Sequence, residues 1–317
     1  MSTNGPSDEL RILVMHPDPA AAPEWVQALQ ARLPEARVSA WPEGAAEATC
    51  AVGWGPPGDF FARAARLKAF FSMGAGVDHL HGHTALPPGL RVIRIEDAGM
   101  GAQMVQYCCH EVLQHHRRFA DYEALQREGR WKTLEITPQK DFGVGLLGLG
   151  VLGEQVARAL VSLGYPVSAF TRSPRTLDDI ACFSGEDEIE TFLGRARVLI
   201  LLAPLTEATR GLLDARRLAM LPQGAWLVNV ARGAILVEQD LLSAIDRGHL
   251  AGATLDVFGK EPLPQDHPFW GHPRIRMTPH VAARTLLRES ADQIAGKLAR
   301  LHRGEAVGGE VDPTLGY

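Results

Sequence analysis

Residues 142–153 read FGVGLLGLGVLG, and this stretch decides the fold. Its first six residues form an apolar run typical of a buried strand, and its last six have the spacing GxGxxG. A helical pattern follows over 154–163 and ends at a glycine. In such a strand–turn–helix, the first glycine permits a tight turn and the second lets the backbone approach a pyrophosphate. The third lets the helix and the strand pack closely.

The start of this helix would also attract an anion, so the stretch predicts the phosphate-binding turn of a dinucleotide site. Glycines in a turn that only packs tightly produce the same spacing, and that interpretation stays open here. The residues that we expect to line the cofactor at this turn are Gly148, Gly150, Val151, Leu152 and Gly153.

Short apolar runs alternate with helical patterns on both sides of this stretch. Toward the C-terminus, the runs lie at 167–171, 198–203, 225–230, 251–257 and 275–277. Toward the N-terminus, they lie at 10–15 and near Val38, Val52, Phe70 and Val92. This alternation indicates parallel βα units. Two such series predict two doubly wound, Rossmann-like α/β domains with an active-site cleft between them.

Two long helical patterns, 101–127 and 284–303, are the candidates for the connection between the domains. In the first pattern, apolar residues and one histidine recur at three- and four-residue steps, at Val105, Cys108, Val112, His116 and Phe119. The 317 residues fit two domains of about 150 residues each. We place the substrate domain at 1–103 with 285–317 and the dinucleotide-binding domain at 104–284.

The bulk composition excludes several classes of protein. Apolar residues make up 46% of the chain and the net charge is −5, which does not suggest a nucleic-acid partner. The N-terminal MSTNGPSDEL lacks the apolar core of a signal peptide, and the longest strongly apolar run, Val198–Leu202, is too short to span a membrane. The four cysteines have no CxxC spacing, which favours a reducing compartment. We therefore expect a cytoplasmic protein without a metal ion, a membrane or a nucleic acid as partner.

The end of the second strand of the C-terminal series bears on the choice of cofactor. An NAD enzyme usually has an acid about 20 residues beyond the glycine turn, for the ribose hydroxyls. Here the strand ends FTRSPR at 170–175, and the first acid is Asp178. Arg172 and Arg175 match a phosphate, and Thr171 and Ser173 can donate further hydrogen bonds, so NADPH is favoured over NADH. A solvated surface turn is the alternative.

Three further residues lie at or after the ends of predicted strands, where ligands bind in open α/β sheets. They are Arg232, Glu261 and His280. Reduction of a 2-keto acid needs a cation that holds the carboxylate and polarises the ketone, and arginine suits both tasks. It also needs a proton donor, such as a histidine that a nearby carboxylate keeps charged. Taken singly, each residue can also be an ordinary surface or loop residue.

Longer segments resemble the D-isomer-specific 2-hydroxyacid dehydrogenase family over essentially the whole chain. They are GLLGLGVLG, LLAPLTEATRGLLD, LVNVARGAILVEQDLLSAI, GATLDVFGKEPLP and HPRIRMTPHVAA. Within them, Arg232, Glu261 and His280 match the family's catalytic arginine, glutamate and histidine. SMGAGVDHL at 72–80, IEDAGMGAQM at 95–104, TRS at 171–173 and GEAVGGEVDPTLGY at 304–317 are most similar to the branch that reduces glyoxylate and hydroxypyruvate with NADPH.

The resemblance also implies binding residues. For the substrate, it implies the backbone amides of a loop at Gly74, Ala75 and Gly76, with Trp54, Met100 and Arg232 nearby. For the cofactor, it implies Leu202, Ala203, Pro204, Thr209, Val230, Ala231 and, beside the nicotinamide amide, Asp256. Packing remains an alternative for Trp54 and Met100, and a strand-end turn for Asp256. The segment 97–107, DAGMGAQMVQY, departs from the asparagine and glutamate of many family members.

The resemblance implies an NAD(P)H-dependent reductase of small 2-keto acids, of the glyoxylate and hydroxypyruvate type, and a homodimer formed through the cofactor domain. Two other functions stay open. One is a dehydrogenase for a bulkier keto acid, such as a phenylpyruvate-like substrate. The other is a dinucleotide-sensing binding protein, since a corepressor branch shares this fold. An intact arginine, glutamate and histidine set argues against the sensor without excluding it.

Overall fold

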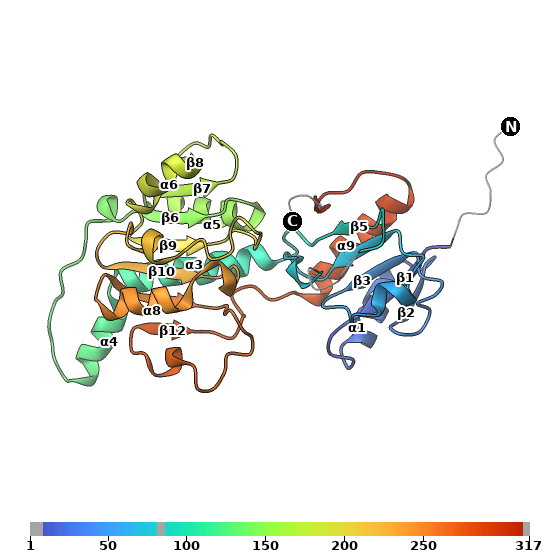
Figure 1. Ribbon diagram of the computed structural model, residues 1–317, viewed down its shortest axis with the longest axis horizontal. Coiled ribbons are helices and arrows are strands. Elements are labelled where there is room, and N and C mark those ends of the chain that lie inside the picture. Colours follow the sequence, from blue (N-terminus) through green and yellow to red (C-terminus); the bar gives the residue numbers. More distant parts are fainter. Residues whose placement is uncertain (1–8, 81–85, 313–317) are drawn as a thin grey trace. The chain divides into compact units, whose positions relative to one another are not determined.

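The computed structural model describes residues 9–80 and 86–312 of the chain. The first eight residues of the polar N-terminal stretch and the last five of the C-terminal motif therefore lie outside the described residues. The chain forms two compact units, one of 1–99 with 285–317 and one of 100–284 (Figure 1). Within the described ranges, no helix is both long and apolar enough to cross a bilayer.

The first unit contains a five-stranded sheet in which every strand pair is parallel, in the order β2-β1-β3-β4-β5. Its strands are β1 (Arg11–Met15), β2 (Arg37–Ala40), β3 (Cys50–Gly53), β4 (Ala69–Ser72) and β5 (Arg91–Ile93). Its helices are α1 (Ala22–Arg32), α2 (Phe60–Arg63), η1 (Asp78–Leu80) and α9 (Leu287–His302). The strand order reverses between β1 and β3, and ligands bind at such a switch point in this kind of sheet.

The second unit contains a seven-stranded parallel sheet in the order β12-β11-β10-β9-β6-β7-β8. The strand order reverses between β6 and β9, as in dinucleotide-binding folds. Its strands are β6 (Val144–Leu147), β7 (Val167–Thr171), β8 (Ile180–Ser184), β9 (Val198–Leu201), β10 (Ala225–Asn229), β11 (Leu250–Leu255) and β12 (Ile275–Met277). The expected pair of parallel-sheet α/β domains is thus confirmed, while the expected cleft stays a prediction.

Helices flank this sheet (Figure 1). They are α3 (Met100–His116), α4 (Phe119–Arg127), η2 (Gln139–Asp141), α5 (Val151–Ser162), α6 (Glu186–Leu193), α7 (Ala215–Leu218), η3 (Gly233–Ile235), α8 (Glu238–Asp246) and η4 (Pro268–Gly271). Strand β9 shows why the central strands are apolar throughout: Leu199 and Leu201 pack in one core cluster, while Val198 and Ile200 pack in another. Because side chains alternate along a strand, these clusters lie on opposite faces of the sheet.

The predicted helix over 101–127 is wrong in one respect, because the structure breaks it into α3 and α4. Arg118 lies between them with a φ of +57°, which no helix contains. The buried stripe ends at His116, whose ring contacts the Tyr165 hydroxyl and the Thr137 carbonyl at 2.8 Å each. Phe119, expected on that stripe, is 44% exposed, and α4 has no buried residue. Nothing in the packing therefore extends α3 beyond its last buried turn.

Strand β8 was not predicted. It forms the edge of the seven-stranded sheet, and only Ile180 of its residues is buried. A mostly exposed edge strand lacks the apolar run that identifies a central strand.

Candidate active site

The glycine turn after β6 has the geometry that its spacing predicts. Gly148 has a φ of +107°, and a Cβ there would lie 2.5 Å from the Ala203 amide nitrogen. A Cβ on Gly153 would lie 2.5 Å from the Gly148 carbonyl oxygen. A Cβ on Gly150, in contrast, would meet no protein atom within 4 Å. Packing therefore requires the first and third glycines, whereas the second keeps the backbone at the start of α5 open to a ligand.

The turn after β7 lies beside this glycine turn. Arg175 donates hydrogen bonds to the Leu149 carbonyl and, over 3.0 Å, to Glu154. Thr171 is buried, and its hydroxyl donates to the Ser173 carbonyl over 2.8 Å. Arg172 and Ser173 are exposed on the turn. Thr171 therefore shapes the turn, and Arg175 ties it to the glycine turn; the expected contacts of all four residues with a phosphate stay predictions.

Two neighbouring strand ends complete this edge of the sheet. After β9 come Leu202, Ala203 and Pro204, and the Thr209 hydroxyl donates to the Pro204 carbonyl over 2.7 Å. After β10, the buried Asn229 accepts from the Ala231 amide and donates to the Arg232 carbonyl, over 3.1 Å each. These contacts hold two loops at the edge of the sheet where the glycine turn lies. Val230 and Ala231, both buried, belong to the second loop.

The structure brings Glu261 and His280 together. His280 Nδ1 lies 2.8 Å from Glu261 Oε2, and both side chains are partly exposed. Arg232 is half-buried, and one guanidinium nitrogen donates to the Ala231 carbonyl over 2.7 Å. Burial raises the pKa of Glu261. Hydrogen bonds from His280 and the Phe258 amide lower it, as do the charges of His280 and Arg232, and together they outweigh the effect of burial. The net result is a pKa below the ordinary value, so this carboxyl is ionised at neutral pH.

The loop that carries His280 is held by Asp256, which directly follows β11 and is 1% exposed. Its carboxylate accepts hydrogen bonds from the Thr278 hydroxyl at 2.6 Å, the Val281 amide at 2.8 Å and the Ala282 amide at 2.9 Å. Its carbonyl accepts from the His280 amide at 2.9 Å. The strand-end role that the sequence left open for Asp256 is thus observed, and its contact with the nicotinamide stays a prediction.

Sequence reasoning missed Tyr107 and Thr278, which support Asp256. The Thr278 hydroxyl donates to Asp256, because a carboxylate only accepts; the Tyr107 hydroxyl, 2.6 Å away, must therefore be the donor to Thr278. Burial raises the pKa of Tyr107, which keeps that proton in place. Tyr107 lies on α3, far in sequence from the strand ends, and no motif or periodicity marks such a partner.

In the first unit, the predicted substrate residues lie at the carboxyl ends of adjacent strands. Trp54 directly follows β3, and Gly74, Ala75 and Gly76 lie in the loop after β4. A Cβ on Gly74 would lie 2.4 Å from the Trp54 ring, so the indole packs directly on this loop. Met100 is buried at the start of α3 in the other unit, which is compatible with the packing role that the sequence left open.

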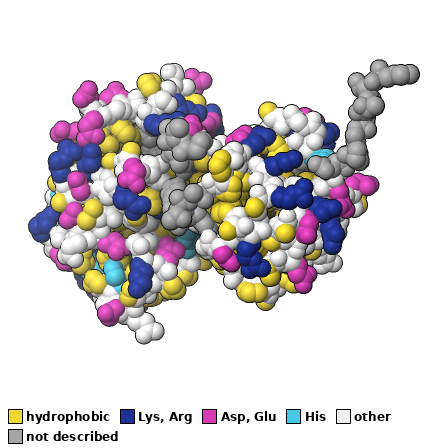
Figure 2. All heavy atoms as spheres, turned by 45° about the vertical axis from the view of Figure 1, so that its right-hand side comes forward, with side chains coloured by type: hydrophobic (Ala, Val, Ile, Leu, Met, Phe, Trp, Pro, Cys, Tyr) yellow, Lys and Arg dark blue, Asp and Glu magenta, His cyan; other side chains and the backbone are white. Residues whose placement is uncertain are grey.

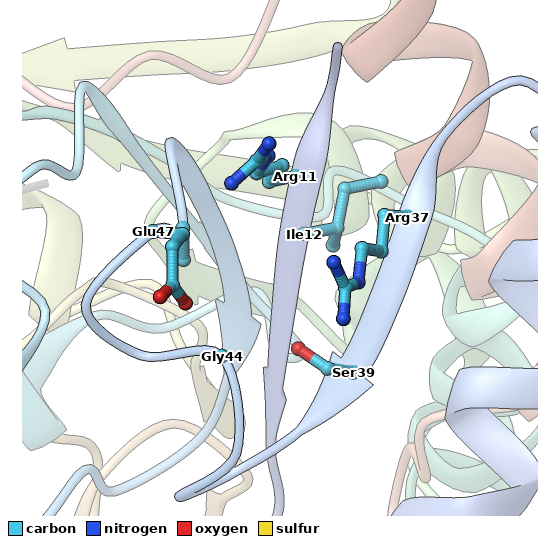
Figure 3. Close-up of a pocket in the computed structure, with 7 residues that line it drawn as sticks. Arg11, Ile12, Arg37, Ser39, Gly44 and Glu47 are labelled. Atoms are coloured by element: carbon cyan, nitrogen blue, oxygen red, sulfur yellow. The ribbon is translucent and has the colours of Figure 1, made fainter.

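The described residues contain no group of three or more His, Cys, Asp or Glu placed to hold a metal ion. A cavity of about 20 Å³ lies between β1, β2 and the loop before β3 (Figure 3), with room for about one water molecule. On the face shown in Figure 2, basic and acidic side chains are interspersed.

A parallel sheet with a glycine turn at its switch point, and a histidine–carboxylate pair after two strands of the same sheet, is the arrangement of dinucleotide-dependent oxidoreductases. The profile of the family "D-isomer specific 2-hydroxyacid dehydrogenase, NAD binding domain" matches residues 109–282. The chain belongs to the D-isomer specific 2-hydroxyacid dehydrogenase family.

Relatives are similar over nearly the whole chain. Glyoxylate/hydroxypyruvate reductase A of Serratia proteamaculans is 44% identical, over 97% of this chain and 100% of that protein. A 2-hydroxyacid dehydrogenase of Xanthobacter autotrophicus, solved with NADPH, has a TM-score of 0.91 at 38% identity, over 96% of this chain and 99% of its own. An NADPH-dependent glyoxylate/hydroxypyruvate reductase of Sinorhizobium meliloti, solved with NADP, has a TM-score of 0.89 at 33% identity, over 98% and 100%.

The lowered pKa of Glu261 predicts how its contribution to stability depends on pH. A carboxyl whose pKa is depressed by folding stabilises the protein above its unfolded value, and this contribution is lost as the pH falls through the folded value. Glu261→Gln should therefore lower Tm at neutral pH, and the difference from wild type should shrink once the pH falls below the ordinary value of 4.5. The measurement is thermal unfolding followed by circular dichroism across this range.

Glu35→Gln, exposed between α1 and β2, is the matched control and should show no such trend. A difference between wild type and Glu261→Gln that increases toward acidic pH would contradict a depressed pKa.

Proposed function

We propose that the protein is a reductase that converts small 2-keto acids of the glyoxylate and hydroxypyruvate type to 2-hydroxy acids with NADPH. The observation that carries this proposal is the 2.8 Å contact between His280 and Glu261, with Arg232 close enough to lower the pKa of the carboxyl. Membership of the family and the names of the similar reductases support the same conclusion.

The roles of the three residues follow from their chemistry. The bound dinucleotide supplies a hydride. The Arg232 guanidinium binds the carboxylate of the keto acid and polarises its ketone. His280 donates a proton to the developing alkoxide from Nε2, because Nδ1 is held by Glu261. The ionised Glu261 fixes the orientation of the imidazole ring through its contact with Nδ1.

The two units divide the binding between them in this proposal. The unit of residues 100–284 holds the dinucleotide, through the glycine turn, the turn after β7 and the loops after β9 and β10. The unit of residues 1–99 with 285–317 contributes the Gly74–Gly76 loop and Trp54 to the keto acid. This division follows the expected domains, with the substrate domain at 1–103 and 285–317 and the dinucleotide domain at 104–284.

The residues present fit the dinucleotide. The space beside Gly150 would be filled by any Cβ, and the turn after β7 presents Arg172 next to the anchored Arg175. A 2′-phosphate would find the Arg172 guanidinium at this turn, while Arg175 neutralises the nearby Glu154, and the strand end itself carries no acid. This arrangement supports NADPH over NADH.

The proposed reaction is tested by NADPH oxidation with a panel of glyoxylate, hydroxypyruvate and phenylpyruvate, followed by absorbance. We expect kcat/KM to be highest for the two small acids. His280→Ala should lower kcat by roughly 10²–10⁴-fold, the usual contribution of a general acid. The affinity for NADPH should be retained, because the glycine turn is unaffected.

His302→Ala, exposed at the end of α9, is the control. Near-normal turnover of His280→Ala would refute its role as the acid. Preference for phenylpyruvate would assign the enzyme to bulkier acids, and no oxidation with any keto acid would favour the dinucleotide sensor.

The preference for NADPH predicts a selective effect of Arg172→Ala. Loss of one charge-assisted contact should raise the KM for NADPH by about tenfold, while the KM for NADH should not change. Steady-state kinetics with both cofactors measures this, with Arg247→Ala, exposed directly after α8, as control. A wild-type preference for NADH would overturn the cofactor assignment.

We propose a homodimer formed through the surface of α4 and the segment that follows it. In this segment, Phe119 is 44% exposed, Ile136 is 47% exposed and Trp131 is wholly exposed. Apolar side chains exposed together on a surface usually mark an interaction site. Trp131→Glu should shift the mass measured by light scattering from that of a dimer toward the 34.4 kDa of one chain.

Trp270→Glu serves as a matched control, because Trp270 is 58% exposed but lies outside this segment. A wild-type protein with the mass of one chain would contradict the homodimer.

The cysteines support a cytoplasmic location. All four are free thiols, and Cys50 and Cys108 are buried. A reducing compartment keeps such thiols unpaired, so we place the enzyme in the cytoplasm.

A further inference from the structure

Ser72 is the last residue of β4, and its side chain is fully buried beside the loop that follows. Its hydroxyl accepts a hydrogen bond from the Gly74 amide at 3.2 Å and donates one to the Gly76 carbonyl at 3.1 Å. His79 Nε2 lies 3.1 Å from the same oxygen. One hydroxyl thus joins both ends of the Gly74–Gly76 loop to a histidine.

The tautomer of His79 follows from its second ring nitrogen. Nδ1 accepts a hydrogen bond from the Gly55 amide at 3.2 Å, so it carries no proton. Nε2 therefore carries the proton of the neutral ring and donates it to Ser72. The Ser72 oxygen then accepts two hydrogen bonds and donates its own proton to Gly76, which uses its full bonding capacity.

The same histidine also positions Trp54. The two rings lie with their centroids 4.1 Å apart, and the Trp54 ring packs against Gly74. The Ser72–His79 pair therefore fixes both the loop and the indole beside it.

The loop carbonyls are bonded to the protein. The Gly74 carbonyl accepts from the Ile95 amide at 3.3 Å, and the Ala75 carbonyl accepts from Arg94 at 3.5 Å. The Gly76 carbonyl accepts from Ser72. Within the described ranges, the Ala75 and Gly76 amides have no such partner. With its carbonyls bonded, the loop can offer amides to an anion, as backbone nests do.

We infer that Ser72 and His79 are positioning residues that set the affinity of the Gly74–Gly76 loop for the carboxylate of the substrate. They act through the backbone and do not contact the reacting atoms. This inference rests on the proposed function, because the ligand of the loop is the keto acid.

The test compares Ser72→Ala, His79→Phe and the double variant of the full-length protein. His79→Phe keeps a ring against Trp54 but removes both nitrogens. Each single change should raise the KM for glyoxylate about tenfold, and weaken calorimetric binding of oxalate to the NADP⁺ complex equally. The kcat and the KM for NADPH should stay near wild type. The double variant should have the same KM for glyoxylate as the more impaired of the two single variants, because both changes disable the same Ser72–His79 hydrogen bond.

Ser290→Ala is the matched control. Ser290 is a fully buried serine of the same unit, and its hydroxyl has no hydrogen-bond partner in the described part of the chain. Its removal should leave the KM for glyoxylate unchanged.

An unchanged KM with a lowered Tm would show that the pair is only structural, and additive effects in the double variant would also overturn the inference. If Ser72→Ala does not fold, the KM for glyoxylate and the Tm of His79→Phe decide between the two outcomes. A wild-type protein that neither reduces glyoxylate nor binds oxalate would refute the proposed function and this inference with it. If the wild type is active and the variants keep its KM for glyoxylate and its affinity for oxalate, this inference alone is refuted.

Discussion

The buried carboxylate of Asp256 is the constraint on which the arrangement of the site depends. Its oxygens accept hydrogen bonds from Thr278, Val281 and Ala282, so the loop after β12 is bonded to the end of β11. His280 lies inside this loop with a φ of +54°, a conformation that such surroundings must enforce. From there its Nδ1 reaches Glu261. A buried charge is costly unless it is fully hydrogen-bonded, and here the same bonds that satisfy Asp256 position the histidine.

The common direction of the strands explains why the loops of the site lie at one edge of the sheet. Strands that run in one direction end at one edge, so the loops after β6, β7, β9, β10 and β11 gather there without further design. Short local hydrogen bonds then set each loop, through Asn229 after β10 and Thr209 after β9. The smaller sheet follows the same logic, with Ser72 holding the loop after β4. After β4 and after β10, a buried polar side chain at the strand end determines which backbone groups a ligand can meet.

Much of the fold could be predicted from the residues, because central strands of a parallel sheet are apolar on both faces. The glycine turn was equally predictable, since its first and third glycines are required by packing. The helix break at Arg118 was not, because it depends on where burial ends. Strand β8 was missed because an exposed edge strand has no apolar run. Tyr107 and Thr278 were missed because hydrogen bonds between distant segments leave no periodic signal, whereas Arg232, Glu261 and His280 were found through motifs.

In the proposed reaction, a hydride moves from NADPH to C2 of a 2-keto acid with one stereochemical outcome. The most direct measurement is the reduction of hydroxypyruvate with NADPH that carries deuterium at the transferred position of C4. Mass spectrometry and chiral chromatography then report the label and the configuration of the product. We expect one deuterium at C2 of a single enantiomer, the D-isomer that the family description specifies. A product without deuterium, or a mixture of both enantiomers, would contradict the proposed reaction.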